Sequence, residues 1–396
     1  MAQDAGDFLS ALQAYRIALE ILPQLAWLGL DIPSRQDWLL RTKAEDLGCL
    51  AATCTIRLGR FEEAIELLDL GRSILWQQSA VLRGDFQKLS ETAPELAREL
   101  QTVSQQLDVD NFHSESLTLG TADFIDDSLE NSSRQRRDLV GTWEELVTKV
   151  RQLPEFGYFL RPVPFHKLCQ SFSKGKVVII NVSDLGLDAL IFNDAQPIQH
   201  VPILDIDRAT LAELASDMSA KRPVVSTRDQ RAQYVRRYMN PALRVVWEDI
   251  ISPIFDAIQI PTTASETPPD RRIWWYLTGP LSFLPIHAAG PGRGVDVSQL
   301  VVSSYVTTLQ SLYTASMQRL GEKSENHVKL LVIGQPETPG QDLCDLPSAK
   351  VEVEEVVEAV LKAGGSEETA MPLVGPDATV SRVSSSLESC TWVHFA

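Results

Sequence analysis

The stretch 175-GKVVIINVSDLGLDALIF-192 decides the fold class of this chain. Residues 175–183 form a β-branched run after a glycine, and residues 187–192 form a second apolar run. The segment Ser183–Gly186 between them contains turn-forming residues, so the two runs predict a β-hairpin. Residues 197–203, PIQHVPI, are a candidate third strand.

Strands and helices alternate downstream of this hairpin. Apolar residues at helical spacing predict helices near 209–220 and over 229–258, with Pro241 interrupting the second. Further elements follow the same two periodicities: strands at 271–277, 300–306, 327–334 and, as a buried strand, 391-TWVHFA-396, and helices at 347–363 and 378–389. This alternation predicts an α/β layered domain with a largely parallel sheet over residues 156–396.

The first 107 residues show helical periodicity instead. Small and bulky residues recur at offsets of 0, 4, 7 and 12 from two alanines: Ala11, Tyr15, Ala18 and Pro23, then Ala64, Leu68, Gly71 and Trp76. Small residues one or two helical turns apart let a neighbouring helix approach closely, and the proline ends its helix. The pattern resembles the second helix of a tetratricopeptide repeat, although Gly71 and Trp76 depart from the usual alanine and proline.

The residues before Ala64 suit the first helix of such a repeat. They include small residues for close packing, and a turn and helix entry: Gly48, Ala51, Ala52, Gly59 and Phe61. The two starting alanines are 53 residues apart, so most of 25–42 reads as an insertion. The first repeat begins at its second helix, from which we expect the chain to be cut, or its start mispredicted, at the front. An unrelated helical bundle is the alternative.

A connecting region separates these helices from the α/β part. Pro94 opens a predicted helix that runs through Leu107, and apolar spacing predicts another over 139–153. Residues 108–131 are acidic and serine-rich without sustained periodicity, so we predict a linker or long loop. Its FIDDSLEN segment is a candidate cation site, with a solvated acidic loop as the favoured alternative. The predicted divisions are therefore 1–107, 108–155 and 156–396.

Composition limits the kinds of partner. The chain has 396 residues and a net charge of −17, and a surface this acidic lacks the basic patch that binds nucleic-acid phosphates or anionic membranes. We expect neither partner. No stretch approaches the roughly 18 apolar residues of a membrane span, and no secretory signal pattern opens the chain. A cytoplasmic location is the simplest expectation.

Metal and cofactor motifs are absent from the sequence. Five cysteines form no CxxC pair and are predicted to be buried free thiols: Cys49, Cys54, Cys169, Cys344 and Cys390. There is no HExxH and no GxSxG. Gly175–Lys176 does not belong to a Walker A loop, because Gln170 and Val177 stand where glycine and serine or threonine belong. We therefore assign no metal and no cofactor.

Four stretches in order carry a family resemblance: 274-WWYLTGPLSFLPIHAAG-290, 303-SSYVTTLQSL-312, 330-LLVIGQPETPGQDLCDLPSAKVEVEEV-356 and 392-WVHFA-396. Together they resemble the CHAT domain, a caspase-like cysteine-peptidase fold often carried behind tetratricopeptide repeats, and they are most similar to its fungal members. The resemblance covers about 156–396 for the domain and much of 1–107 for the repeats. It implies an all-α repeat region followed by an incomplete caspase-like α/β domain.

The resemblance also implies a Cys–His dyad, which this sequence does not hold. The family's catalytic histidine precedes a glycine directly after the strand that corresponds to WVHFA, and its cysteine ends a later strand. His394 matches the first histidine of that strand, which is not the catalytic one, and Cys390 precedes the strand. In a strand these two side chains would lie roughly 13 Å apart, beyond hydrogen-bond reach. We assign no catalytic residue and expect truncation before the dyad.

Three other stretches carry candidate groups. His287 in LPIHAAG is a possible site-shaping residue, and a histidine satisfied by backbone groups at a turn is the favoured alternative. GPGRG at 290–294 has the glycines of an anion-binding loop, but a surface turn is favoured because Pro291 removes one donor. GQPETPGQ at 334–341 follows a strand, where α/β ligands bind, yet it has no charged clamp.

These observations predict a fragment of a larger protein. Its full-length form would resemble a caspase-like peptidase coupled to a repeat-based module that binds a protein or peptide. The fragment alone is expected to be inactive and, with its sheet incomplete, to expose a strand edge and aggregate. The alternative is a non-enzymatic repeat scaffold with a structural pseudo-peptidase domain.

Overall fold

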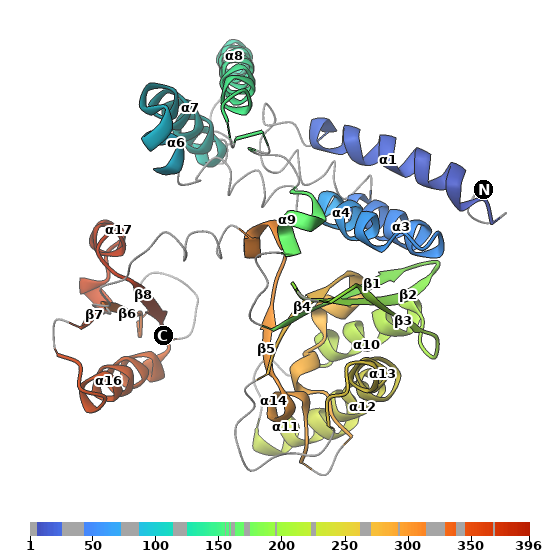
Figure 1. Ribbon diagram of the computed structural model, residues 1–396. Coiled ribbons are helices and arrows are strands. Elements are labelled where there is room, and N and C mark those ends of the chain that lie inside the picture. The colour runs from blue at the N-terminus through green and yellow to red at the C-terminus, as the bar shows by residue number, and fades with distance from the viewer. Residues whose placement is uncertain are drawn as a thin grey trace. The chain divides into compact units, whose positions relative to one another are not determined.

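The computed structural model describes residues 6–25, 43–72, 87–113, 125–154, 156–157, 159, 163–169, 175–194, 196–222, 227–261, 271–291, 294–313, 329–337, 345–366 and 369–396. Trp76, Cys344 and most of the predicted insertion lie outside them. The chain divides into two compact units, Met1–Arg319 and Leu320–Ala396 (Figure 1). The described N-terminal part is helical, and mixed α/β structure follows it.

A five-stranded sheet organises the first unit. Its strands are β1 (Lys176–Ser183), β2 (Gly186–Phe192), β3 (Gln199–Ile203), β4 (Arg272–Leu277) and β5 (Val302–Tyr305), in the order β3-β2-β1-β4-β5. The predicted hairpin is confirmed, since β1 and β2 pair antiparallel. The expected largely parallel sheet is wrong for this unit: β2 and β3 are also antiparallel, and only β1, β4 and β5 run parallel. The turn between β1 and β2 is too short for the crossover that parallel strands need.

Helices cover both faces of this sheet (Figure 1). Because side chains alternate across a strand, β1 sends Val178 and Ile180 into one core and Val177 and Ile179 into the other. The first core is closed by helices that follow the hairpin: α10 (Arg208–Ala220), α12 (Asn240–Val246) and α13 (Ser252–Ala257). The second is closed by helices that precede it: α3 (Ala44–Arg57), α4 (Phe61–Gly71) and α9 (Phe165–Cys169). A strand buried on both faces reads as a continuous apolar run.

The helices α1 (Phe8–Leu25), α3 and α4 pack closely, as their small residues predict. A Cβ added to Gly71 would lie 2.7 Å from the Cα of Gly48, so a larger side chain would force α3 and α4 apart. Pro23 does not end α1, which continues to Leu25. The α3–α4 hairpin, predicted as part of a repeat region, therefore forms one layer of the α/β sandwich.

A second helical group follows. It comprises α6 (Gln87–Thr92), α7 (Pro94–His113) and α8 (Ile125–Arg151), joined through apolar residues such as Leu100, Val147 and Val150. The loop predicted at 108–131 is wrong at both ends, where α7 and α8 extend into it, while 114–124 lies outside the described residues. Loss of apolar periodicity marks the end of the packed face, and a helix can continue beyond that face.

One long helical run links β3 to β4. It contains α11 (Arg228–Tyr234), the π-helical η3 (Val235–Met239), α12, the π-helical η4 (Trp247–Ile251) and α13. Pro241 does not interrupt it. Each π-helical turn lies just before a proline, Pro241 or Pro253, and such a widened turn accommodates the ring and the missing N–H that would disrupt a regular helix.

The second unit is a smaller parallel sheet with two helices. Its elements are β6 (Leu330–Gly334), α16 (Pro347–Lys362), β7 (Ala370–Val374), α17 (Val380–Leu387) and β8 (Trp392–Phe395), with strand order β7-β6-β8. The strand β7 was not predicted, because Pro372 argues against a strand. The proline is tolerated here because β7 lies at the edge of the sheet.

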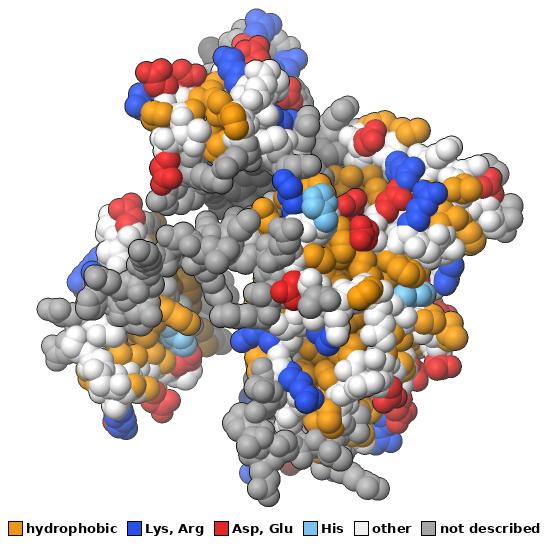
Figure 2. Space-filling view, in the orientation of Figure 1, with side chains coloured by type: hydrophobic (Ala, Val, Ile, Leu, Met, Phe, Trp, Pro, Cys, Tyr) orange, Lys and Arg blue, Asp and Glu red, His pale blue; other side chains and the backbone are white. Residues whose placement is uncertain are grey.

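The terminal strand forms as predicted, but its predicted burial is wrong. β8 pairs with β6, yet Trp392 is 65% and Phe395 70% exposed. It lies at the edge of the sheet that the described residues form, where one neighbouring strand covers less of its surface. Figure 2 shows hydrophobic side chains at the surface of this unit. Among the described residues, no helix is both long and apolar enough to cross a membrane.

Candidate functional site

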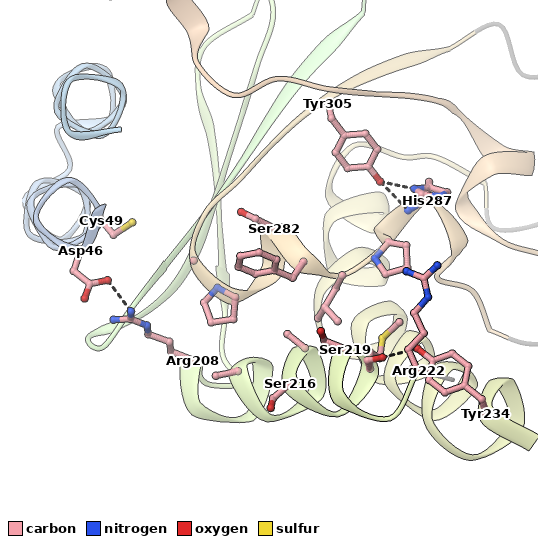
Figure 3. A pocket seen from close by; sticks show the side chains of 18 residues that line it. Asp46, Cys49, Arg208, Ser216, Ser219, Arg222, Tyr234, Ser282, His287 and Tyr305 are labelled. Atoms are coloured by element: carbon pink, nitrogen blue, oxygen red, sulfur yellow. Dashed lines mark hydrogen bonds and ion pairs between the residues drawn. The ribbon is translucent and has the colours of Figure 1, made fainter. Parts of the chain in front are cut away.

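A groove of about 930 Å³ opens at the carboxyl ends of β4 and β5 (Figure 3). Its walls come from α3, α10, α11, the end of β5 and the two 3-10 turns after β4, η5 (Gly279–Phe283) and η6 (Ile286–Ala288). In α/β folds, ligands bind outside the carboxyl ends of parallel strands. The groove is therefore the first place to look for a function in this unit.

The turn from β4 into η5 is fixed by β1. The buried Thr278 hydroxyl donates to the Ile180 carbonyl at 3.1 Å and accepts from the Val182 N–H at 2.8 Å. Gly279 then adopts a φ of 55°, a left-handed conformation that favours glycine. The groove wall thus follows from the parallel pairing of β1 and β4.

An ion pair lies at the α3 end of the groove. Arg208 contacts the Asp46 carboxylate at 2.6 Å and Asp184 at 3.1 Å. Cys49 lies beside them, and burial raises the pKa of its thiol to about 11. The thiol is therefore protonated at neutral pH, whereas a cysteine nucleophile needs a lowered pKa.

His287 and Tyr305 form the opposite end. The Nδ1 atom of His287 lies 2.7 Å from the Tyr305 hydroxyl, which also accepts the His287 backbone N–H at 3.2 Å. The rings meet edge to face, with centroids 5.8 Å apart. Burial raises the pKa of Tyr305, opposed by the bond from the His287 backbone. His287 thus lies in the groove wall, and the partner of its Nδ1 is a phenol rather than a backbone group.

Cys390 and His394 have different partners in the second unit. The Cys390 thiol donates to the Leu387 carbonyl at 3.5 Å, and the His394 Nε2 lies 3.0 Å from the Glu352 carboxylate. The two side chains thus contact separate groups. The geometry agrees with the sequence argument against pairing these residues.

In the remaining candidate stretches, two glycines lie at close backbone approaches. A Cβ on Gly290 would overlap the Val295 carbonyl, which explains this glycine as part of a tight turn, and a Cβ on Gly175 would lie 2.5 Å from the Arg272 carbonyl. The side chains of FIDDSLEN and the second half of GQPETPGQ lie outside the described residues. Across the described side chains, no cluster of three His, Cys, Asp or Glu residues could hold a metal.

Sequence reasoning missed the contacts between α4 and the strand ends. Asp69 accepts the backbone N–H of Leu309 at 2.7 Å, the N–H of Gln310 at 3.3 Å and the Tyr276 hydroxyl at 3.3 Å. Arg72 donates to the carbonyl of Leu277 and lies 4.9 Å over the Tyr276 ring. These partners are more than 200 residues from α4, so no local pattern could have found them.

Arg72 also reaches the groove wall. Its guanidinium lies 3.3 Å from the hydroxyl of Ser282, a residue of η5 that lines the groove. The last turn of α4 therefore holds the same loop that forms the groove.

A buried polar cluster joins α3 to the hairpin. Asn181 donates to the Cys49 carbonyl at 3.1 Å and to the Thr53 hydroxyl at 2.9 Å. Asp188 is fully buried, 2.7 Å from His200 and 3.6 Å from Arg57. The sequence alone could have singled out these two residues, because Asn181 and Asp188 are polar residues inside two otherwise apolar strand runs.

The three-layer arrangement, with a groove at the carboxyl ends of β4 and β5, is that of an α/β protein. Residues 240–396 match the family model of the CHAT domain, so a caspase-like, cysteine-peptidase-related domain is found in this part of the chain. The groove residues of η5, η6 and β5 lie within the match, and those of α3, α10 and α11 precede it. A search of curated proteins found no match.

Proposed function

We propose that this chain couples a protein-binding helical region to its caspase-like domain. One observation carries the proposal. The helix α1 buries Leu12, Leu19 and Leu22 on one side and exposes Leu9, Ile17 and Ile21 on the other. The exposed residues are spaced by multiples of four and lie along one stripe. A helix that is apolar on both sides has a second surface suited to burial against a partner.

The resemblance of the N-terminal helices to tetratricopeptide repeats supports the same role. Such repeats bind protein segments on the surfaces of their stacked helices. The close α3–α4 pair and its packing against α1 are what a repeat of this kind requires. A protein or peptide partner on α1 is therefore the proposed ligand of the helical region.

A non-enzymatic scaffold is the second candidate function, and the described thiols favour it. Burial raises the pKa of Cys54, and raises that of Cys49 and Cys169 to about 11. Cys390 bonds a carbonyl, and no described cysteine has a histidine as its hydrogen-bond partner. In this alternative the caspase-like domain contributes shape rather than chemistry, as a structural pseudo-peptidase.

The partner surface is tested by replacing its exposed apolar residues. We expect the double variant Ile17→Ser with Ile21→Ser to lose proteins that co-purify with the wild-type chain, as measured by quantitative mass spectrometry. Gln13→Ser is the matched control, because Gln13 is exposed on the same stripe and is already polar. An unchanged set of co-purified proteins in the double variant would exclude α1 as the partner surface.

An active-site thiol probe separates the two candidate functions. It is applied to the folded chain beside variants with single Cys→Ala replacements. Labelling that one replacement abolishes supports a peptidase. Equal labelling of all variants supports the scaffold.

A further inference from the structure

The segment that borders the groove is basic in an otherwise acidic chain. Between residues 221 and 244 the sequence holds seven basic residues and one acidic residue, while the chain as a whole has a net charge of −17. The basic side chains are all exposed: Lys221, Arg222, Arg228, Arg231, Arg236, Arg237 and Arg244. This local reversal of charge favours an acidic ligand beside α11 and η3.

Arg222 brings this charge into the groove. It follows the end of α10, lines the groove and extends toward its His287 end (Figure 3). Within the described part of the chain no carboxylate forms an ion pair with Arg222, whereas Arg208, at the other end, is paired with Asp46 and Asp184. A guanidinium binds a carboxylate through two parallel hydrogen bonds, so Arg222 is suited to an incoming Asp or Glu side chain.

The rest of the groove suits a peptide chain. Phe283 is 80% exposed on η5, and Met218, Pro280 and Pro285 add apolar surface around the groove. The hydroxyls of Ser216, Ser219 and Ser282 also line it. Apolar walls with a few polar groups are typical of sites that enclose an organic ligand, and the volume is at the upper end for such sites.

We propose that this groove binds a short acidic segment of a protein partner, in which an Asp or Glu carboxylate pairs with Arg222 and a neighbouring apolar side chain contacts Phe283. The site is separate from the α1 surface and does not depend on it. A peptide is favoured over a nucleic acid because Phe283 and the prolines offer an apolar surface that apolar side chains of a peptide can contact. A long polyanion would also meet the acidic remainder of the surface.

The widened turn beside the groove supports the assignment. Tyr234 lines the groove with its hydroxyl bonded to the Met218 carbonyl at 2.7 Å, and η3 begins at the next residue. Single π-helical turns within α-helices occur frequently at functional sites. Here the turn carries Arg236 and Arg237 on the basic segment next to Tyr234.

A displayed library of random 12-residue peptides tests the proposal, with the folded chain as bait. We expect the selected peptides to be enriched in Asp and Glu next to Leu, Ile or Phe. Peptides selected on the Arg222→Glu variant should not be enriched in Asp and Glu. The affinity of a selected, fluorescein-labelled peptide is then measured by fluorescence polarisation. Arg222→Ala should weaken binding by about tenfold or more, as expected for a lost charge-assisted pair.

Matched variants identify the groove as the site. Phe283→Ser should weaken binding of the same peptide several-fold. Arg244 is an exposed arginine of the basic segment that does not line the groove, so Arg244→Ala should change the affinity by less than about twofold. A thermal melt confirms that each variant is folded. Selected peptides without acidic enrichment, or equal affinities for wild type and Arg222→Ala, would overturn the proposal. So would a 12-nucleotide single-stranded DNA that binds more tightly with the same dependence on Arg222.

Discussion

The strands β1 and β8 are both largely apolar runs, but they have different surroundings. β1 is rich in β-branched residues, β8 contains Trp392, Val393 and Phe395, and each strand forms a parallel pair with a neighbour. Val177–Ile180 of β1 are fully buried, whereas Trp392 and Phe395 of β8 are mostly exposed. β1 is the central strand of five, with a helical layer on each face, while β8 is an edge strand of three. An apolar run thus predicts the strand, but neighbouring elements decide how far it is buried.

The largest expected effect compares two tryptophans. Trp275 on β4 is fully buried, so Trp275→Ala should lower the free energy of unfolding by about 4 kcal/mol. Trp392→Ala should cost less than about 1 kcal/mol, because most of its side chain is already in water. Hydrogen exchange of the β4 and β6 amides in increasing urea measures each unit separately. Equal losses of stability for the two variants would show that Trp392 on β8 is as buried as Trp275 on β4.

The next effect tests the helical layer that covers β1. Gly71→Ala should lower the free energy of unfolding by about 2 kcal/mol, because its Cβ would overlap the Gly48 backbone and separate α4 from α3. Gly141→Ala on α8 is the control, since no atom lies within 4 Å of its Cβ position. That change should stabilise α8 by about 0.5 kcal/mol. A neutral Gly71→Ala in urea denaturation would mean that this layer is loosely packed.

A pH effect tests the contacts from α4 to the strand ends. Burial raises the pKa of Asp69, against the lowering effect of the Leu309 and Gln310 N–H groups. Its unfolded carboxyl loses a proton near pH ~4, while the folded one retains it to higher pH. The stability that Asp69 contributes through its raised pKa is therefore fully present below about pH 4. It is lost as the pH rises through the pKa of the folded state. In urea titrations at a series of pH values, the free energy of unfolding of Asp69→Asn should not show this loss as the pH rises.

Asp207 supplies the control of opposite sign. Its pKa is lowered by the hydrogen bond from the Thr210 backbone at the start of α10. Its contribution is present above the unfolded pKa and is lost as the pH falls through the folded pKa. Asp207→Asn should therefore reduce the loss of stability on the acid side. Identical pH profiles for wild type and Asp69→Asn would show that Asp69 is not buried as the structure places it.

The smallest effect on stability concerns the exposed surface of β8. Phe395→Ser should change the free energy of unfolding by less than about 0.5 kcal/mol, because the side chain is largely in water. It should nevertheless reduce self-association, measured by light scattering against concentration, since it removes apolar surface next to a strand edge. Val380→Ser, at an exposed residue of α17 away from the strands, is the control. Unchanged scattering for Phe395→Ser would show that β8 does not promote association.

The sequence predicted most elements of the α/β part. The hairpin, the helix after it and the strands β4, β5, β6 and β8 all lie where apolar periodicity and turn residues place them. The strand β7 escaped because Pro372 disfavours a strand, and helix continuity through Pro241 escaped because a π-helical turn absorbs the proline. The match of 240–396 to the CHAT domain agrees with the motifs that carried the resemblance.

The groove was only partly predictable. His287 was singled out because it follows a strand and a Gly–Pro turn, which is a local signal. Arg222, Tyr305 and Asp46 carried none, because the groove brings together residues from four separate parts of the chain. Asp69 and Arg72 were likewise hidden within an ordinary amphipathic helix. Their roles depend on partners more than 200 residues away.

The positions of helices and strands follow from local sequence, because side-chain periodicity, turn residues and glycines act within a few residues of each other. Close packing of α3 and α4 is likewise written in the sequence, because Gly48 and Gly71 carry no side chain where the two helices meet. The long-range contacts of the fold are what place this helical pair over the sheet, bury β1 but not β8, and direct Arg222 to a groove. Burial and electrostatic environment depend on which distant segments become neighbours, and that information is not local in the chain.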